Sequence, residues 1–128
     1  MKIILASKSE VRKEILERNS VDCTVIPSNV DEDQVKDSLL AVGANPMLIS
    51  KNLAELKSTK VSSKYPNQRV LGADSVISLN NELINKPISR EEGLKILKKL
   101  NGSKHYLITS VCISQNGAMV WNFTDQSE

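Results

Sequence analysis

Three side chains near the start of the chain could bind an anion. Residues 7–12 (SKSEVR) join an apolar run to a helical pattern and carry two hydroxyls and one guanidinium. Backbone N–H groups at a helix N-terminus and the helix dipole both favour negative charge there. We interpret Ser7, Ser9 and Arg12 as a candidate phosphate-binding turn. The alternative is an ordinary capped helix with a surface arginine.

A carboxylate interrupts the most strand-like run of the chain, residues 70–77 (VLGADSVI). Asp74 must lie at a strand end or find a partner there, because a bare carboxylate is costly among apolar side chains. Beside a metal ion or an ammonium group it would be poised as a base or a ligand. The alternative is a strand-end aspartate that caps a loop.

The acidic run at residues 31–33 (DED) allows two interpretations. Its carboxylates could supply oxygen ligands to Mg²⁺, which prefers carboxylates together with phosphates. It could also be the solvated N-terminus of a helix, where acidic side chains favour the helix dipole.

The other polar candidates carry no spacing signal of their own. Lys57 and Lys86 are two of thirteen lysines, and most lysines are simply solvated. His105 is the only histidine, and the spacing shows no nucleophile that would complete a catalytic triad with it. Neither GxxxxGK[ST] nor GxGxxG occurs, so nucleotide chemistry would need a different scaffold.

Alternating strand and helix patterns must position these residues. In the first half, the sequence predicts a buried strand at 3–6, followed by a helix that a Ser7–Glu10 capping box opens and that ends near residue 19. A strand at 23–26 and a weak helix at 34–42 are expected next. Asn45-Pro46 offers the start of a longer helix, which we expect to reach about residue 63 with Ile49, Leu53 and Leu56 along one face.

In the second half, the strand at 70–77 leads through Asn80-Asn81 into a short strand at 82–85. Ser89 and Glu92 open a further helix, for which we expect Leu94, Leu97 and Leu100 on one face and a stop at Gly102. Strands at 106–114 and 118–124 flank Asn116-Gly117, a strong hairpin signal. An apolar arm with Trp121 and Phe123 would normally be covered, so we expect further structure beyond residue 128.

Composition favours one α/β domain spanning residues 1–128, with 40% hydrophobic and 25% charged residues. The formal net charge of +2 is too small and too dispersed for a nucleic-acid or membrane surface. Aromatic residues make up only 3%, which disfavours a stacking platform for single strands. No apolar run could span a bilayer, so a cytoplasmic protein is expected.

The order of these motifs resembles the Maf family of nucleoside triphosphate pyrophosphatases. The matching motifs are Ile4-Leu5-Ala6-Ser7-Lys8-Ser9, Arg12, Val30-Asp31-Glu32, Leu53-Ala54 with Lys57, Gly72-Ala73-Asp74-Ser75-Val76, and Lys86-Pro87. Asn101-Gly102, His105 and Thr109-Ser110-Val111 follow in order. Several ordered motifs are far more specific than any single one.

The resemblance implies a fold, an activity and a cofactor. The fold would be a mixed, twisted sheet flanked by helices, similar to that of inosine triphosphatases. The activity would be hydrolysis of a nucleoside triphosphate between its α and β phosphates, a housecleaning reaction that includes modified nucleotides. A divalent metal, Mg²⁺ with Mn²⁺ as an alternative, and a homodimer are also implied.

Position by position, the resemblance implies roles for individual residues. Asp74 matches the catalytic acid/base, and Glu32 matches an acidic site residue, so these two carboxylates are the expected metal ligands. The expected phosphate-binding residues are Ser7, Ser9, Arg12, Lys57 and Lys86.

Base preference is expected to depend on Val11 and Ser75. Ser75 is similar to the dTTP/UTP type, whereas Val11 matches neither that type nor the methylated-GTP type. Family members usually continue through a further stretch that completes the cleft. A nucleotide-binding or interaction remnant with weak or no turnover is therefore the second hypothesis.

Overall fold

A mixed sheet of six strands with four helices makes up the described part of the chain. The computed structural model describes residues 2–7, 9–80, 82–84, 89–101 and 104–128. In chain order the elements are β1 (Lys2–Leu5), α1 (Glu10–Arg18), β2 (Asp22–Val25), α2 (Glu32–Ala41), α3 (Pro46–Ser62), β3 (Val70–Leu79), β4 (Glu82–Ile84), α4 (Arg90–Leu100), β5 (His105–Gln115) and β6 (Ala118–Ser127). The α/β class predicted from the sequence is confirmed.

The strand order leaves part of β3 open on one side. The sheet runs β2-β1-β3-β5-β6, with β1 parallel to both of its neighbours and the other pairs antiparallel. Pairing of β1 with β3 ends at Leu5↔Leu71, and β4 joins the same edge of β3 only at Ile77. Among the described strands, residues 72–76 of β3 therefore pair with β5 alone.

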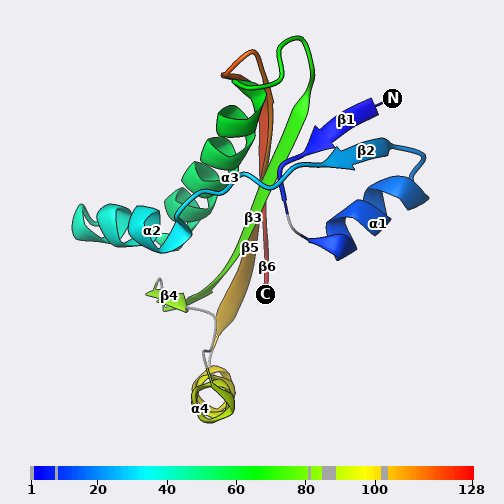
Figure 1. Ribbon diagram of the computed structural model, residues 1–128. Helices are drawn as coiled ribbons and strands as arrows, with labels where there is room; N and C mark the ends of the chain where they lie inside the picture. The colour runs from blue at the N-terminus through cyan, green and yellow to red at the C-terminus, as the bar shows by residue number, and fades with distance from the viewer. Residues whose placement is uncertain (1, 8, 81, 85–88, 102–103) are drawn as a thin grey trace.

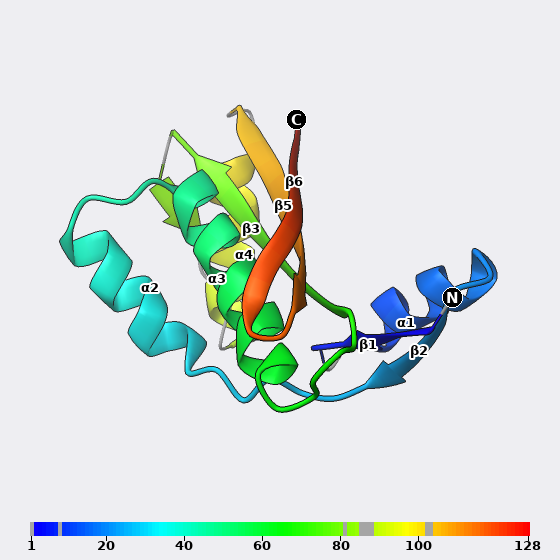
Figure 2. The ribbon, with the colours of Figure 1, turned by 90° about the horizontal axis from the view of Figure 1, so that it is seen from above.

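Helices lie on both sides of the long strands. Figure 1 shows α2 and α3 on one side of β3 and β5, and α1 on the other side beside β1 and β2. The view from above shows the same division, with the tip of the β5–β6 hairpin near the C-terminal end of α3 (Figure 2). There the N–H of Gly117 donates to Ser62 Oγ at 3.0 Å.

Small residues let α3 lie close to the sheet. Ser50 and Ser58 are fully buried, and their hydroxyls lie 2.9 Å from Ser110 Oγ and 2.7 Å from Ser114 Oγ on β5. A Cβ added at Gly72 would lie 2.7 Å from the backbone N of Ser58. Glycine is therefore required at this crossing for steric reasons.

Several local predictions are confirmed. Asn45 caps α3 and Ser89 caps α4 through their side chains. Asn80, Asn116 and Gly117 take the positive φ values, 51°, 54° and 80°, that their hairpin turns require. The stop at Gly102 lies outside the described residues. None of the described helices combines the length and the apolar character needed to cross a membrane.

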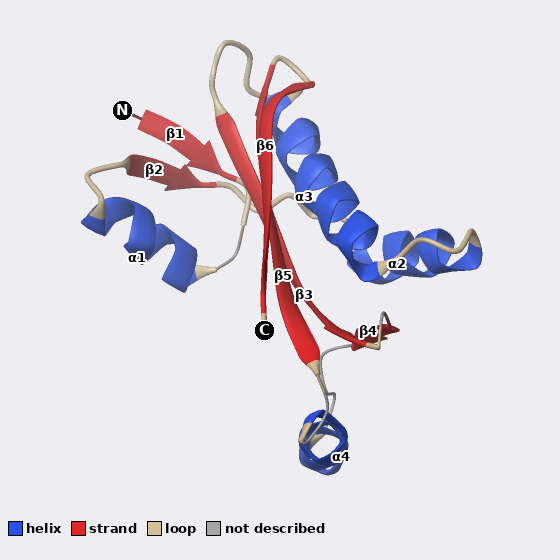
Figure 3. Cartoon of the chain, turned by 180° about the vertical axis from the view of Figure 1, so that it is seen from behind, coloured by secondary structure: helices blue, strands red, loops and turns tan. Residues whose placement is uncertain are grey.

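Two predicted helix faces are less buried than their leucine spacing suggests. Leu94 and Leu97 of α4 are 52% and 64% exposed, and α4 buries none of its residues. Seen from behind, α4 lies beyond the ends of β3 and β5 (Figure 3). On α3, Ile49 and Leu53 are buried as expected, but Leu56 is exposed because the helix turns its serines toward β5 instead.

Candidate functional site

The turn after β1 is organised by hydroxyl groups. Leu5 is fully buried, which fixes the end of β1 in the sheet. Ser9, not Ser7 as the capping-box spacing suggested, caps α1 by accepting from the N–H of Arg12 at 3.3 Å. Ser7 Oγ instead accepts from the N–H of Ser9 at 3.1 Å and from Arg12 Nη1 at 3.2 Å. Three of the predicted phosphate-binding residues, Ser7, Ser9 and Arg12, therefore lie in one hydrogen-bonded turn.

Asp74 lies in the middle of β3 and not at a strand end. It is opposite Ser110 of β5, and its side chain is 9% exposed. Its Oδ1 lies 3.4 Å from Lys57 Nζ, whereas Oδ2 has no hydrogen-bond partner among the described residues. The loop-capping alternative for Asp74 is therefore wrong, and a buried carboxylate oxygen is left available for a proton or a ligand.

Lys57 joins two carboxylates that are far apart in the sequence. Its ammonium group forms ion pairs with Asp74 and with Glu32. Glu32 is the first residue of α2, which Asp31 caps by accepting from the N–H of Gln34. The acidic run is thus a helix N-terminus, as one interpretation predicted, and the same turn places Glu32 beside Lys57.

The surroundings of Asp74 change its proton affinity. Burial raises the pKa of its carboxyl above the ordinary value of 3.8. The Lys57 ammonium opposes this rise, and the negative charge of Glu32 adds to it. A carboxylate with a raised pKa accepts a proton more readily, which suits a general base.

One backbone carbonyl connects the two cationic sides of the site. The O atom of Ala73 accepts from Arg12 Nη1 and from Lys57 Nζ, each at 3.4 Å. Ala73 belongs to the stretch of β3 that pairs with β5 alone, so side chains can reach it. The carbonyl dipole offsets part of the repulsion between the two cations and holds them near one another.

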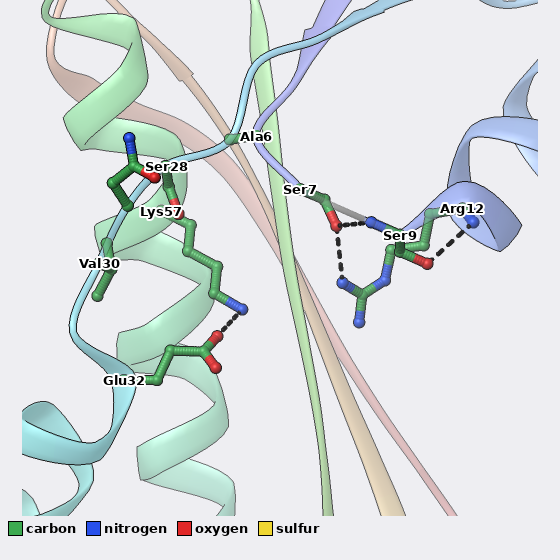
Figure 4. Close-up of a pocket in the computed structure, with 9 residues that line it drawn as sticks. Ala6, Ser7, Ser9, Arg12, Ser28, Val30, Glu32 and Lys57 are labelled. Carbon is green, nitrogen blue, oxygen red and sulfur yellow. Dashed lines mark hydrogen bonds and ion pairs between the residues drawn. The ribbon is translucent and has the colours of Figure 1, made fainter.

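A cavity of about 400 Å³ opens between these groups. Figure 4 shows Ser7, Ser9 and Arg12 facing Lys57 and Glu32 across it. The full lining is Ala6, Ser7, Ser9, Arg12, Ser28, Asn29, Val30, Glu32 and Lys57. Asp74 is not part of the lining and contacts the cavity residue Lys57. Five predicted site residues therefore meet around one cavity, and the catalytic candidate Asp74 contacts one of them, Lys57.

The sequence offered no reason to choose Ser28 and Asn29 as cavity residues. They follow Pro27 in the connection between β2 and α2, and Asn29 has a positive φ of 56°. Lys60 Nζ donates to the carbonyl of Asn29 at 2.8 Å and ties this connection to α3. Asparagine adopts a positive φ more readily than most residues, so an asparagine two residues after a proline was the only sequence signal.

Three further predictions remain untested by this arrangement. Val11 lies on α1 and is 64% exposed. Ser75 Oγ lies 3.1 Å from Thr109 Oγ1. Neither Val11 nor Ser75 lines the cavity. Ser75 follows Asp74 in β3, so the two side chains point to opposite faces of the sheet. Lys86 lies outside the described residues.

The carboxylates of Glu32 and Asp74 are compatible with binding a divalent metal ion. Within the described ranges, no group of three or more His, Cys, Asp or Glu side chains could hold an ion alone. Glu32 and Asp74 nevertheless share one neighbour, Lys57, and Asp74 Oδ2 has no partner among the described residues. Two carboxylates fit Mg²⁺ when phosphate oxygens and water complete the coordination.

Comparison with known sequences places the chain in a family. A model of the Maf-like protein family matches residues 2–128. The chain belongs to the Maf family. The nucleoside triphosphate pyrophosphatase of Pelagibacter ubique (strain HTCC1062) is 60% identical over 125 residues, which cover 98% of this chain and 64% of the relative.

Other Maf relatives and solved structures are more distant. The dTTP/UTP pyrophosphatase of Pyrococcus furiosus is 38% identical over 112 residues, which cover 88% of this chain and 55% of that protein. The Ham1 protein of Staphylococcus aureus superposes with a TM-score of 0.63 at 15% identity, covering 98% of this chain and 69% of that chain. The likeness to Ham1 confirms the expected fold, and the Maf chain spans less than two thirds of the length of both relatives.

Proposed function

We propose that this Maf chain hydrolyses nucleoside triphosphates between the α and β phosphates, giving a monophosphate and pyrophosphate. One observation carries the proposal: the buried Asp74 carboxylate contacts Lys57, and Lys57 lines one cavity together with Ser7, Ser9 and Arg12. Two cations and two hydroxyls thus line one cavity, and the candidate base contacts one of the two cations. The names of the relatives add support from the same reaction class.

In the proposed reaction, a water oxygen forms a bond to the α-phosphorus while its proton passes to the Asp74 carboxylate. The bond from the α-phosphorus to the bridging oxygen breaks, and pyrophosphate leaves with the electron pair. Arg12 and Lys57 neutralise the negative charge that grows on the leaving group. Ser7 and Ser9 orient the phosphates by donating hydrogen bonds.

We include a divalent metal, Mg²⁺ in the first instance and Mn²⁺ as the alternative, with Glu32 and Asp74 as its protein ligands. Such an ion would neutralise phosphate charge and lower the pKa of a bound water. Lys57 contacts both carboxylates, so its ammonium would have to share them with the ion. The chain's own contribution is to keep the two carboxylates together.

The finer parts of the proposal concern substrate, assembly and location. Ser75 favours a pyrimidine nucleotide through its family resemblance, and Lys86 is included as a further phosphate ligand on the same ground. A homodimer without nucleic-acid partners and a cytoplasmic location complete the proposal. Sizing chromatography tests the dimer, since a monomeric elution volume would contradict it.

The decisive experiment measures pyrophosphate release from dTTP, UTP, CTP, GTP and 7-methyl-GTP with Mg²⁺, Mn²⁺ or EDTA. The variants are Asp74→Asn and, as a matched control, Asp37→Asn, which removes an exposed carboxylate of α2. We expect the Asp74 variant to lose about 100-fold or more in kcat, the usual contribution of a general base. The control should match the wild type.

Each outcome separates the two functional hypotheses. Equal kcat in wild type and Asp74→Asn would contradict the proposed mechanism. Nucleotide that raises the melting temperature without release of pyrophosphate would favour the binding remnant over the enzyme, because a ligand of the native state stabilises it by mass action. Activity that EDTA leaves unchanged would contradict the metal.

A further inference from the structure

Asp74 has a second contact with α3, through its backbone. Ser50 Oγ lies 3.1 Å from the carbonyl O of Asp74 and 2.9 Å from Ser110 Oγ. Ser50 is fully buried and Ser110 is 1% exposed. The hydrogen bond to Asp74 therefore forms away from water, where its loss leaves the carbonyl poorly compensated.

Ser50 and Lys57 hold the same residue from one helix. They are seven residues apart on α3, which places them on one face about 10 Å apart along the axis. Ser50 contacts the backbone of Asp74, and Lys57 contacts its carboxylate. Together the two contacts fix both the position of Asp74 in β3 and the direction of its side chain.

This stretch of β3 needs such support. Residues 72–76 pair with β5 alone among the described strands, so one side of the strand lacks a ladder of backbone hydrogen bonds. A carbonyl oxygen has two lone pairs and can accept from a side chain as well as from a neighbouring strand. The Ser50 hydroxyl adds a tertiary hydrogen bond at the residue that carries the base.

The Ser50 hydroxyl has one proton and two acceptors, the carbonyl of Asp74 and Ser110 Oγ. The two acceptors therefore compete for that proton. Removing the Ser110 hydroxyl would leave the whole proton for Asp74, whereas removing the Ser50 hydroxyl would leave Asp74 without this bond. Ser50 and Ser110 are thus not equivalent, although they touch.

We infer that Ser50 is a positioning residue for the Asp74 carboxylate. The inference rests on the proposed function, in which Asp74 is the base, and it extends that function to a residue outside the cavity. Ser50 contacts no residue of the phosphate-binding turn in the hydrogen bonds described above. Its loss is therefore expected to change kcat and not KM.

The test compares Ser50→Ala with Ser58→Ala and Ser110→Ala. Ser58 is the matched control because it lies on the same face of α3, is equally buried and pairs with Ser114 of β5 instead. We expect Ser50→Ala to lower kcat about tenfold or more, since small misplacements of a reacting group are costly. KM should stay within about twofold. Ser58→Ala and Ser110→Ala should keep the wild-type kcat at a temperature where all variants are folded.

Amide hydrogen exchange gives a readout that needs no turnover. Ser50→Ala should speed exchange at residues 73–75 relative to Val70 in the same protein, and Ser58→Ala should not. If wild type and Ser50→Ala turn over equally, the inference is overturned while the proposed function stands. If the wild type shows no turnover, the proposed function fails. The exchange measurement then tests the inference by itself, and equal exchange at residues 73–75 in the Ser50 and Ser58 variants would overturn it.

Discussion

Helices α3 and α4 differ in a way that their sequences do not suggest. The leucines of α4 recur at regular helical intervals, yet none of its residues is buried. In α3, by contrast, nine residues are buried, and three serines and a lysine are among them. An apolar stripe shows which face of a helix could be buried. Close approach and paired hydroxyls determine how α3 is held against β3 and β5.

The largest effect is expected inside the α3 interface. Leu53 is fully buried, so Leu53→Ala should lower the free energy of unfolding by about 2–5 kcal/mol through lost burial and a cavity. Urea denaturation followed by far-UV circular dichroism measures this loss. A loss below 1 kcal/mol would show that the α3 interface tolerates cavities. It would then contradict the claim that burial matters more in α3 than in α4.

Gly72→Ala tests the close approach itself. Its new Cβ would meet the backbone of Ser58 and the carbonyl of Ala54, neither of which can rotate away. Overpacking of this kind costs about 1–3 kcal/mol. Gly43→Ala is the control, because a Cβ there meets nothing within 4 Å and only the positive φ of 81° opposes it. Thermal melts should show the greater loss at Gly72, and an equal loss at both sites would contradict the steric argument.

Asp74→Asn, at the residue of β3 that Lys57 of α3 contacts, should change how the free energy of unfolding depends on pH. Burial raises the pKa of Asp74, so between pH 3.8 and the higher folded pKa the native state binds more protons than the unfolded state. Wild-type stability therefore falls as pH rises through that window, and the asparagine variant lacks this fall. The stability of the variant relative to wild type should be greater at pH 7 than at pH 3 in urea titrations. A relative stability that shrinks with rising pH would reverse the sign and contradict the burial argument.

The smallest effect is expected in α4. Leu97 is 64% exposed, so Leu97→Ala should change the free energy of unfolding by less than about 0.5 kcal/mol. The same urea titration used for Leu53→Ala measures both variants side by side. A loss of 2 kcal/mol or more would mean that α4 is covered in solution and would remove the contrast between the two helices.

The sequence predicts the local features of this fold well. Turns depend on residues that are adjacent in the chain, so Asn116-Gly117 and the caps Asn45 and Ser89 could be interpreted directly. The capping-box spacing assigned the N-cap of α1 to Ser7, whereas Ser9 caps the helix. This error is also local, because both hydroxyls lie within reach of free N–H groups. Element order and class follow from such local signals.

The site could be predicted only in part. Asp74 is recognisable as a carboxylate in an apolar strand, but its partner Lys57 carries no spacing signal and was chosen only through the family resemblance. The contacts of Ser50 and the cavity residues Ser28 and Asn29 depend on packing between distant segments. No periodic pattern encodes a hydroxyl pair across an interface, because serine occurs equally well on solvated faces.

The aromatic pair on β6 has an optical consequence. Trp121 is the single tryptophan of the chain, is half-exposed, and stacks on Phe123 with ring centroids 6.3 Å apart. Neither ring lines the cavity. Intrinsic fluorescence of this protein therefore reports on the outer hairpin. A molecule that covers β6 should shift the emission to shorter wavelength, whereas a nucleotide in the cavity should leave the spectrum in place.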